Sequence, residues 1–133
     1  MSRVLLDTTF LVDADRSGSP LDEVVDDDDE VALAAITIAE LLVGVELADR
    51  SHRAARQQFV DEIRDTIPIV DYDSTVASSH AQLLVVTRQQ GKPRGAHDLI
   101  IAATARATQR DVVSADPSAF LDLPGVSFRS HRS

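Results

Sequence analysis

Short apolar runs that alternate with helical stretches are the feature that most constrains the fold of this 133-residue chain. Residues 31–36 form a continuous apolar run bounded by polar residues, which is typical of a strand buried on both faces. Shorter runs at residues 3–6 and 112–115 indicate similar strands. Helical patterns separate these runs. Alternating strands and helices favour an α/β fold, a parallel sheet flanked by helices on both faces in an α/β/α sandwich.

Two further strands and six helices complete the expected order of elements. A strand is expected at residues 67–70, where Pro68 indicates an edge position, and a last one at residues 126–129. Helices are expected at residues 9–16, 21–25, 37–48, 51–65, 74–90 and 96–110. Thr37 and Glu40 have the S/T-x-x-E spacing of a capping box, so they should open the third of these helices.

Four carboxylates stand where these apolar segments begin or end. Asp7 and Asp116 directly follow predicted strands, whereas Glu40 and Asp98 lie in the first turns of predicted helices. In open parallel sheets, ligands bind outside the carboxyl ends of the strands. We therefore expect the four acids to meet at one rim of the sheet.

Each acid alone also has a structural interpretation. Asp7 can cap the helix that follows it, and Glu40 can serve as the reciprocal partner of its capping box. Asp98 can complement a helix dipole, and Asp116 before Pro117 is a common way to start a turn. The functional interpretation depends on the joint placement of all four.

Converging carboxylates imply a cation. Carboxylates without basic partners repel one another, and their pKa values rise unless a cation neutralises them. A set of oxygen ligands favours Mg²⁺, with Mn²⁺ as the alternative ion. Such an ion polarises a phosphoryl oxygen and lowers the pKa of a bound water, which is the chemistry of phosphodiester hydrolysis. It would also supply positive charge to a chain whose net charge of −9 disfavours non-specific nucleic-acid binding.

Several other kinds of site are excluded by composition. The chain has no cysteine, which excludes disulfides, zinc–thiolate sites, iron–sulfur clusters and thiol nucleophiles. Lys92 is the one lysine, and its surroundings lack the glycine and Ser/Thr positions of a P-loop. Of the four histidines, His97 is the one we expect near the acids. No apolar run is long enough to span a bilayer, so we expect a cytoplasmic protein with one domain over residues 1–133.

Four segments resemble motifs of the PIN domain family. Residues 4–11 (VLLDTTFL) are similar to its first strand and turn, and residues 37–44 (TIAELLVG) to the helix that carries its second acid. Residues 95–103 (GAHDLIIAA) resemble the third motif and are the most specific of the set. Residues 113–116 (VSAD), followed by Phe120, resemble the fourth. The segments cover nearly the whole chain in the family's order, and the length is most similar to the VapC toxins of bacterial toxin–antitoxin pairs.

The resemblance implies an activity, a cofactor and partners. It implies a Mg²⁺-dependent endoribonuclease toxin, with Asp7, Glu40, Asp98 and Asp116 as its catalytic, metal-binding acids. It also implies a homodimer and a small VapB-like antitoxin that covers the site in a hetero-oligomer. The alternatives are a non-catalytic interaction module of the same fold and a structure-specific DNA nuclease.

The chain departs from the family pattern near its fourth acid. Ser114 stands where the family usually has Thr, and Pro117 can tilt the carboxylate of Asp116. Thr8 and Ser114 are candidates for positioning water or phosphate, and Lys92, Arg94 and Arg3 for contacting the RNA backbone. The acidic run at residues 26–30 is not part of the pattern, and we expect it to be a solvated loop.

Overall fold

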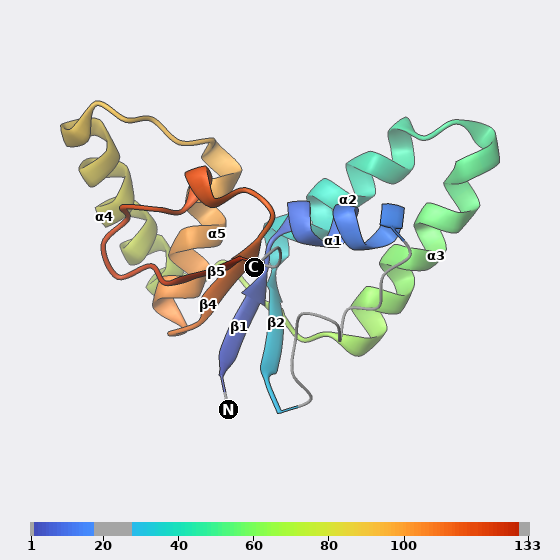
Figure 1. Ribbon diagram of the computed structural model, residues 1–133, viewed down its shortest axis with the longest axis horizontal. Helices are drawn as coiled ribbons and strands as arrows, with labels where there is room; N and C mark the ends of the chain where they lie inside the picture. Colours follow the sequence, from blue (N-terminus) through green and yellow to red (C-terminus); the bar gives the residue numbers. More distant parts are fainter. Residues whose placement is uncertain (1, 18–27, 131–133) are drawn as a thin grey trace.

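The computed structural model describes residues 2–17 and 28–130, which form a five-stranded sheet with helices on both faces (Figure 1). The strand order is β3-β2-β1-β4-β5, and all neighbouring strands are parallel. The strands are β1 (Arg3–Leu6), β2 (Glu30–Ala34), β3 (Ile69–Val70), β4 (Asp111–Ser114) and β5 (Phe128–Ser130). The helices are α1 (Thr8–Ser17), α2 (Ala35–Leu47), α3 (Arg50–Thr66), α4 (Ser74–Gln90) and α5 (Ala96–Ala107). A 3-10 turn follows at Pro117–Ala119. The predicted helix at residues 21–25 lies outside the described residues.

Two apolar clusters pack on opposite faces of the sheet and confirm the α/β/α arrangement. Leu5 of β1 belongs to the cluster beneath α4 and α5, whereas its neighbours Val4 and Leu6 belong to the cluster beneath α1, α2 and α3. This alternation follows from the period of two in a strand. Because both faces are covered, the central strands need apolar residues at every position, which explains their continuous apolar runs. None of the helices in the described ranges is long and apolar enough to cross a membrane.

The sheet changes direction of winding at β1. This strand pairs with β2 on one side and with β4 on the other, so the connections that leave its carboxyl end diverge there. In the β1–β4 register Leu6 lies opposite Val113, and the backbone N–H of Asp7 donates to the Val113 carbonyl at 2.9 Å. Asp7 and Ser114 therefore stand side by side at the topological switch point, where open α/β sheets bind their ligands.

The boundary between β2 and α2 differs from the prediction. The strand ends at Ala34 and the helix begins at Ala35, so Thr37 lies inside the helix and Glu40 in its second turn. The prediction of a capping box at Thr37 and Glu40 is wrong, because the N-cap residue is Ala34, which provides no side-chain hydrogen bond. An apolar run buried on both faces does not reveal where a strand becomes a buried helix, and alanine favours the helix.

Helix ends elsewhere follow local chemistry. Asp73 caps α4 by accepting from the Val76 N–H at 3.0 Å, and Gly91 ends that helix with a left-handed φ of 64°. The helix predicted at residues 96–110 ends earlier, at Ala107, and Gln109 has a positive φ of 54°. This turn removes Arg110 from the helix, and its side chain reaches the amino end of the sheet, where it donates to the carbonyls of Val4 and Glu30. The edge position predicted for the strand near Pro68 is confirmed by β3.

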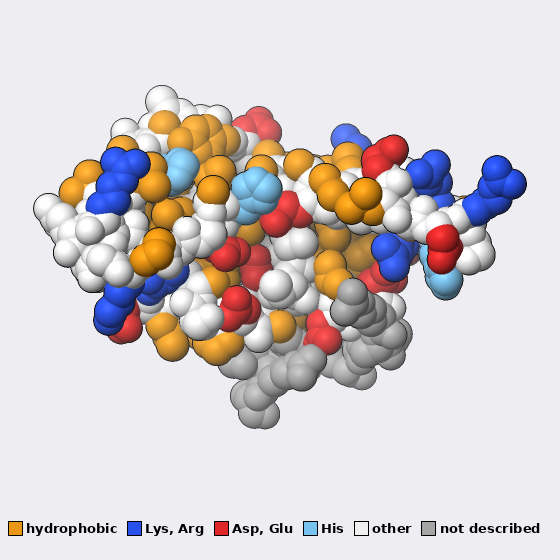
Figure 2. All heavy atoms as spheres, turned by 90° about the horizontal axis from the view of Figure 1, so that it is seen from above, with side chains coloured by type: hydrophobic (Ala, Val, Ile, Leu, Met, Phe, Trp, Pro, Cys, Tyr) orange, Lys and Arg blue, Asp and Glu red, His pale blue; other side chains and the backbone are white. Residues whose placement is uncertain are grey.

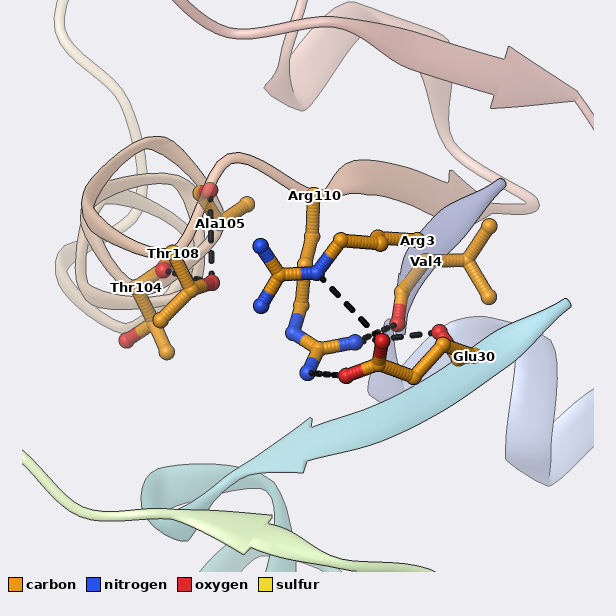
Figure 3. A network of polar contacts seen from close by, with 7 residues as sticks. All are labelled: Arg3, Val4, Glu30, Thr104, Ala105, Thr108 and Arg110. Carbon is orange, nitrogen blue, oxygen red and sulfur yellow. Dashed lines mark hydrogen bonds and ion pairs between the residues drawn. The ribbon is translucent and has the colours of Figure 1, made fainter. Parts of the chain in front are cut away.

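The amino end of the sheet holds ion pairs that the sequence did not reveal (Figure 3). The buried guanidinium of Arg110 donates to the Glu30 carboxylate at 2.8 Å and to the Glu30 carbonyl at 3.0 Å, and Arg3 lies 3.6 Å from the same carboxylate. Arg129 binds Asp29 at 3.0 Å. The prediction of a solvated loop is therefore wrong for Asp29 and Glu30, the last two residues of the acidic run. Arg3 also lies at the end of the sheet opposite the acid rim.

Candidate metal centre at the carboxyl edge of the sheet

Asp7 is the buried acid of the rim. Its side chain follows β1, is 1% exposed, and accepts hydrogen bonds from the hydroxyls of Thr9 at 2.7 Å and Ser114 at 2.6 Å. Its backbone carbonyl accepts from Leu11 N–H at the start of α1. The backbone carbonyl of Asp7 thus joins the start of the helix, while its carboxylate is bound to β4 through Ser114.

Glu40 approaches from α2 and is held at both oxygens. Its Oε1 accepts from the Thr8 hydroxyl at 2.7 Å, and its Oε2 lies 3.3 Å from Nδ1 of His97. The donors come from the first turns of α1 and α5, so one carboxylate connects three helices. The structural interpretation of Glu40 as a helix cap does not apply, because it lies too far along α2.

Asp98 lies in the first turn of α5 and folds back over the helix start. A Cβ atom at position 95 would stand 2.8 Å from Oδ2 of Asp98, so Gly95 provides the room that this carboxylate occupies. Burial raises the pKa of Asp98, and the negative charges of Asp7, Glu40 and Asp116 raise it further. The four acids of the rim are therefore close enough to repel one another.

Asp116 is the least inward of the four acids. It is exposed, and its Oδ1 accepts from the Ser118 hydroxyl at 2.6 Å within the turn that Pro117 begins. Its backbone N–H donates to Ser114 Oγ at 2.9 Å, so Ser114 connects the loop of Asp116 to Asp7. The turn that Pro117 begins therefore holds one oxygen of this carboxylate against Ser118.

A hollow at the rim brings the first three acids together with residues that sequence reasoning missed. In Figure 2, which looks onto this edge from above, acidic side chains gather around the centre of the molecule. The hollow is lined by Asp7, Thr8, Thr9, Val12, Asp13, Glu40, Asp98 and Ala115. Thr9 and Asp13 were missed. Their spacing of four residues on α1 places them on one helix face, which is the signal that could have found them.

The donor set fits a hard divalent cation. Its side chains offer oxygen ligands, and a cation would offset both the burial and the neighbouring negative charges that raise the pKa of Asp98. Within the described ranges no three acidic or histidine side chains form a ready-made cluster for a metal ion. The hydroxyls of Thr8, Thr9 and Ser114 hold the carboxylates instead. A bound ion would compete with these hydrogen bonds.

The residues expected to position substrate have specific partners. Thr8 and Ser114 each donate to a carboxylate of the rim, so both orient acids. Arg94 donates to the carbonyls of Lys92 at 2.9 Å and Leu121 at 2.7 Å, which ties the loop before α5 to the turn after β4. Lys92 is exposed on that loop. Of the two basic residues, Lys92 therefore has the freer charge.

Comparison with known proteins places the chain in a family. The model of the PIN domain family matches residues 4–125. The chain is 34% identical over 126 residues to the ribonuclease VapC5 of Mycobacterium tuberculosis, covering 92% of this chain and 89% of the relative. The VapBC-5 toxin–antitoxin structure from M. tuberculosis is similar at 29% identity, with a TM-score of 0.78 and 98% of each chain covered.

A second solved structure supports the fold alone. The VapBC2 structure from Rickettsia felis, bound to a DNA fragment from its promoter, has a TM-score of 0.86 at 22% identity, covering 96% of this chain and 98% of the other. Its high structural and low sequence similarity shows that the arrangement of sheet and helices is shared. With the family match and the VapC5 relative, these findings show that the chain belongs to the PIN domain family, as a VapC-like member.

Proposed function

We propose that this chain is a divalent-metal-dependent endoribonuclease that acts as the toxin of a VapBC-type pair. The observation that carries the proposal is the hollow at the switch point, where Asp7, Glu40 and Asp98 line one space. Burial raises the pKa of Asp98 there, and the charges of Asp7 and Glu40 raise it further. Relatives support the reaction class. They include the ribonuclease VapC5 and, at 27% identity over 99 residues, a tRNA(fMet)-specific endonuclease VapC of Shigella flexneri.

Mg²⁺ is the ion we propose for the acid rim, with Mn²⁺ as the alternative. Asp7, Glu40 and Asp98 would hold it, and Asp116 would contribute directly by turning from Ser118, or through a water. When bound, such an ion polarises a phosphoryl oxygen and lowers the pKa of water. The reaction class is hydrolysis, in which water adds to phosphorus in line with the P–O3′ bond and the 3′ oxygen leaves with a proton.

The hydroxyls of the rim set the orientation of its acids. Thr9 and Ser114 both donate to Oδ2 of Asp7, which fixes the orientation of this carboxylate beside the hollow. Thr8 fixes Oε1 of Glu40 in the same manner. Such hydrogen bonds to ligand carboxylates maintain the geometry of a metal site and are costly to remove.

A VapB-like antitoxin is the partner we propose. An apolar groove continues from the hollow, since Val12 and Glu40 line both, and it extends between α1, α2 and α3 past Leu41, Phe59 and Val60. An apolar segment with a basic residue suits this surface, because its charge would reach the acids. The relatives in VapBC complexes support such a partner.

We further propose that the toxin is a single PIN domain over residues 1–133, forms a homodimer, and acts in the cytoplasm.

Loss of either central acid tests the proposal. Asp7→Asn and Asp98→Ala should each lower Mg²⁺-dependent RNA cleavage by about a thousandfold, because ion-based charge stabilisation contributes several kcal/mol to the barrier. Glu62→Gln, an exposed acid of α3, is the matched control and should keep full activity. Cleavage that is abolished by EDTA but unchanged in both variants would show that the site is assigned to the wrong residues.

A further inference from the structure

His97 is a nitrogen base at the edge of the acid rim. It is the second residue of α5, directly before Asp98, and its side chain is 56% exposed. Its Nδ1 lies 3.3 Å from Oε2 of Glu40, whose other oxygen is already bound by Thr8. The imidazole is thus anchored through one nitrogen to an acid that lines the hollow, while most of the ring faces solvent.

The contact with Glu40 determines which ring nitrogen faces the surroundings. Nδ1 is the nitrogen that lies against the Glu40 carboxylate, so Nε2 is the nitrogen left for another partner. Among the described residues no hydrogen bond reaches Nε2, and the exposure of the ring leaves it accessible. The rim therefore carries one oriented ring nitrogen that none of its carboxylates or hydroxyls uses.

A ribose 2′-hydroxyl is the group of an RNA backbone that can pair with this nitrogen. The hydroxyl both donates and accepts, so it can hydrogen-bond to Nε2 as either partner. DNA lacks it. A histidine anchored next to the acids can therefore read the sugar of a nucleotide whose phosphate lies over the hollow.

We propose that His97 is a specificity-determining residue through which this site favours RNA over DNA, with Nε2 hydrogen-bonded to a 2′-hydroxyl of the bound strand. The inference rests on the proposed ribonuclease function. It assigns Nδ1 to the orientation of the ring by Glu40 and Nε2 to the substrate. Thr8 still donates to Oε1 of Glu40 when His97 is removed.

The test measures binding separately from cleavage. The full chain carrying Asp7→Asn, which should not cleave, is titrated in Mg²⁺ with a short single-stranded RNA of randomised sequence and with the same pool built from DNA. Adding His97→Ala should lower the RNA-to-DNA affinity ratio by about three- to tenfold, the net contribution of one hydrogen bond. The change should come from weaker RNA binding, with DNA binding unaltered.

Two variants sharpen the result. His97→Gln keeps an amide that can pair with a hydroxyl, so it should retain most of the ratio. His52→Ala is the matched control, because His52 also contacts a carboxylate through Nδ1, at 2.7 Å from Asp49, but on α3 away from the rim acids. It should leave the ratio unchanged. Thermal unfolding of each variant confirms that it is folded.

The outcomes distinguish this inference from the function beneath it. RNA cleavage by the wild-type chain, together with an unchanged ratio in His97→Ala, would overturn the role of His97 and leave the proposed function intact. Equal weakening of RNA and DNA would also overturn it, since His97 would then act on the backbone or on Glu40 alone. A wild-type chain that cuts no RNA would overturn the proposed function itself.

Discussion

The two ends of the sheet carry acids in opposite surroundings. At the amino end, Asp29 and Glu30 are bound by arginines, and Arg110 reaches Glu30 through both its carboxylate and its backbone carbonyl. At the carboxyl end, the acids of the rim have hydroxyls and one imidazole as partners, and their charges raise the pKa of Asp98. Both ends carry acids, and in the part of the chain that the structure describes, arginines pair with the acids of the amino end.

This difference separates stability from function. A buried arginine with a carboxylate partner ties strands together, and removing either partner leaves an uncompensated charge. Carboxylates that face one another without a cation cost stability, and such an arrangement persists where a bound ion or substrate benefits from it. The amino end is therefore interpreted as a structural clasp and the carboxyl end as a binding site. The predictions below follow from exchanging or removing the charges at each end.

A matched pair of glutamates gives the largest expected contrast. Glu40→Gln should lower RNA cleavage by about a hundredfold or more, because an acid of the rim loses its charge, while the melting temperature changes little. Glu30→Gln should keep the activity per folded molecule but lose about 1–2 kcal/mol of stability, since its half-exposed carboxylate pairs with Arg110. Cleavage assays and thermal unfolding of both variants measure the contrast. Equal loss of activity in the two would contradict it.

Arg110 should carry most of the stability of the clasp. Its guanidinium is 8% exposed and donates to Glu30 and to the carbonyl of Val4. Arg110→Met keeps the apolar stem and should cost about 2–3 kcal/mol of unfolding free energy, because the acceptors lose a charged donor. Arg110→Lys should recover only part of it, since an ammonium cannot reproduce the planar fork. Denaturant unfolding at neutral pH provides the measurement, and a change below 0.5 kcal/mol would contradict the role.

How much of this contrast the sequence predicts depends on how far apart in the sequence the interacting residues are. The apolar runs predicted the strands and their parallel arrangement, and Pro68 predicted the edge position of β3, because these depend on local pattern. The positions of Asp7 and Asp98 at element boundaries also predicted the rim. Glu40 reached it although its helix begins at Ala35 and not at Thr37, since its long side chain still extends to the rim.

The interactions that were not predicted join residues far apart in the sequence. Thr8 and Glu40 are 32 residues apart, and Arg110 and Glu30 are 80 apart. A run of acidic residues gives no sign of which positions will meet an arginine, so Glu30 was assigned to a solvated loop. Likewise, the helical pattern through Arg110 did not reveal that the chain turns at Gln109. This turn brings the guanidinium of Arg110 to Glu30 at the amino end of the sheet.

The raised pKa of Asp98 predicts a stability that depends on pH and on the ion. Below about pH 4, the ordinary pKa of an aspartate, Asp98 is neutral in the folded and unfolded states and costs nothing. As pH rises past that value, the unfolded state ionises first, so the fold loses stability until the folded group has ionised too. Asp98→Asn removes this penalty and should raise the melting temperature at pH 7 without divalent ions, with a smaller gain near pH 4.

Mg²⁺ should reverse the order of these two proteins. Binding at ten times the dissociation constant stabilises the wild type by about 1.4 kcal/mol, whereas Asp98→Asn lacks one ligand and should gain less. Thermal unfolding with and without Mg²⁺ at pH 7 provides the comparison. A wild type that is not stabilised by millimolar Mg²⁺ or Mn²⁺ would favour a non-catalytic interaction module over the metal-dependent nuclease.

The smallest expected effect concerns the basic loop beside the rim. Lys92 is exposed, so Lys92→Ala should lower the slope of log affinity for RNA against log salt by about one, the loss of a single phosphate contact. Arg94→Ala should instead cost about 1–2 kcal/mol of stability, because its guanidinium binds the carbonyls of Lys92 and Leu121. Arg64→Ala, in the last turn of α3, is the control for removing a positive charge far from the rim acids. An equal change of slope for Lys92→Ala and Arg64→Ala would show that RNA senses only net charge. A change for Lys92→Ala alone would extend the RNA path from the acid rim onto the loop before α5.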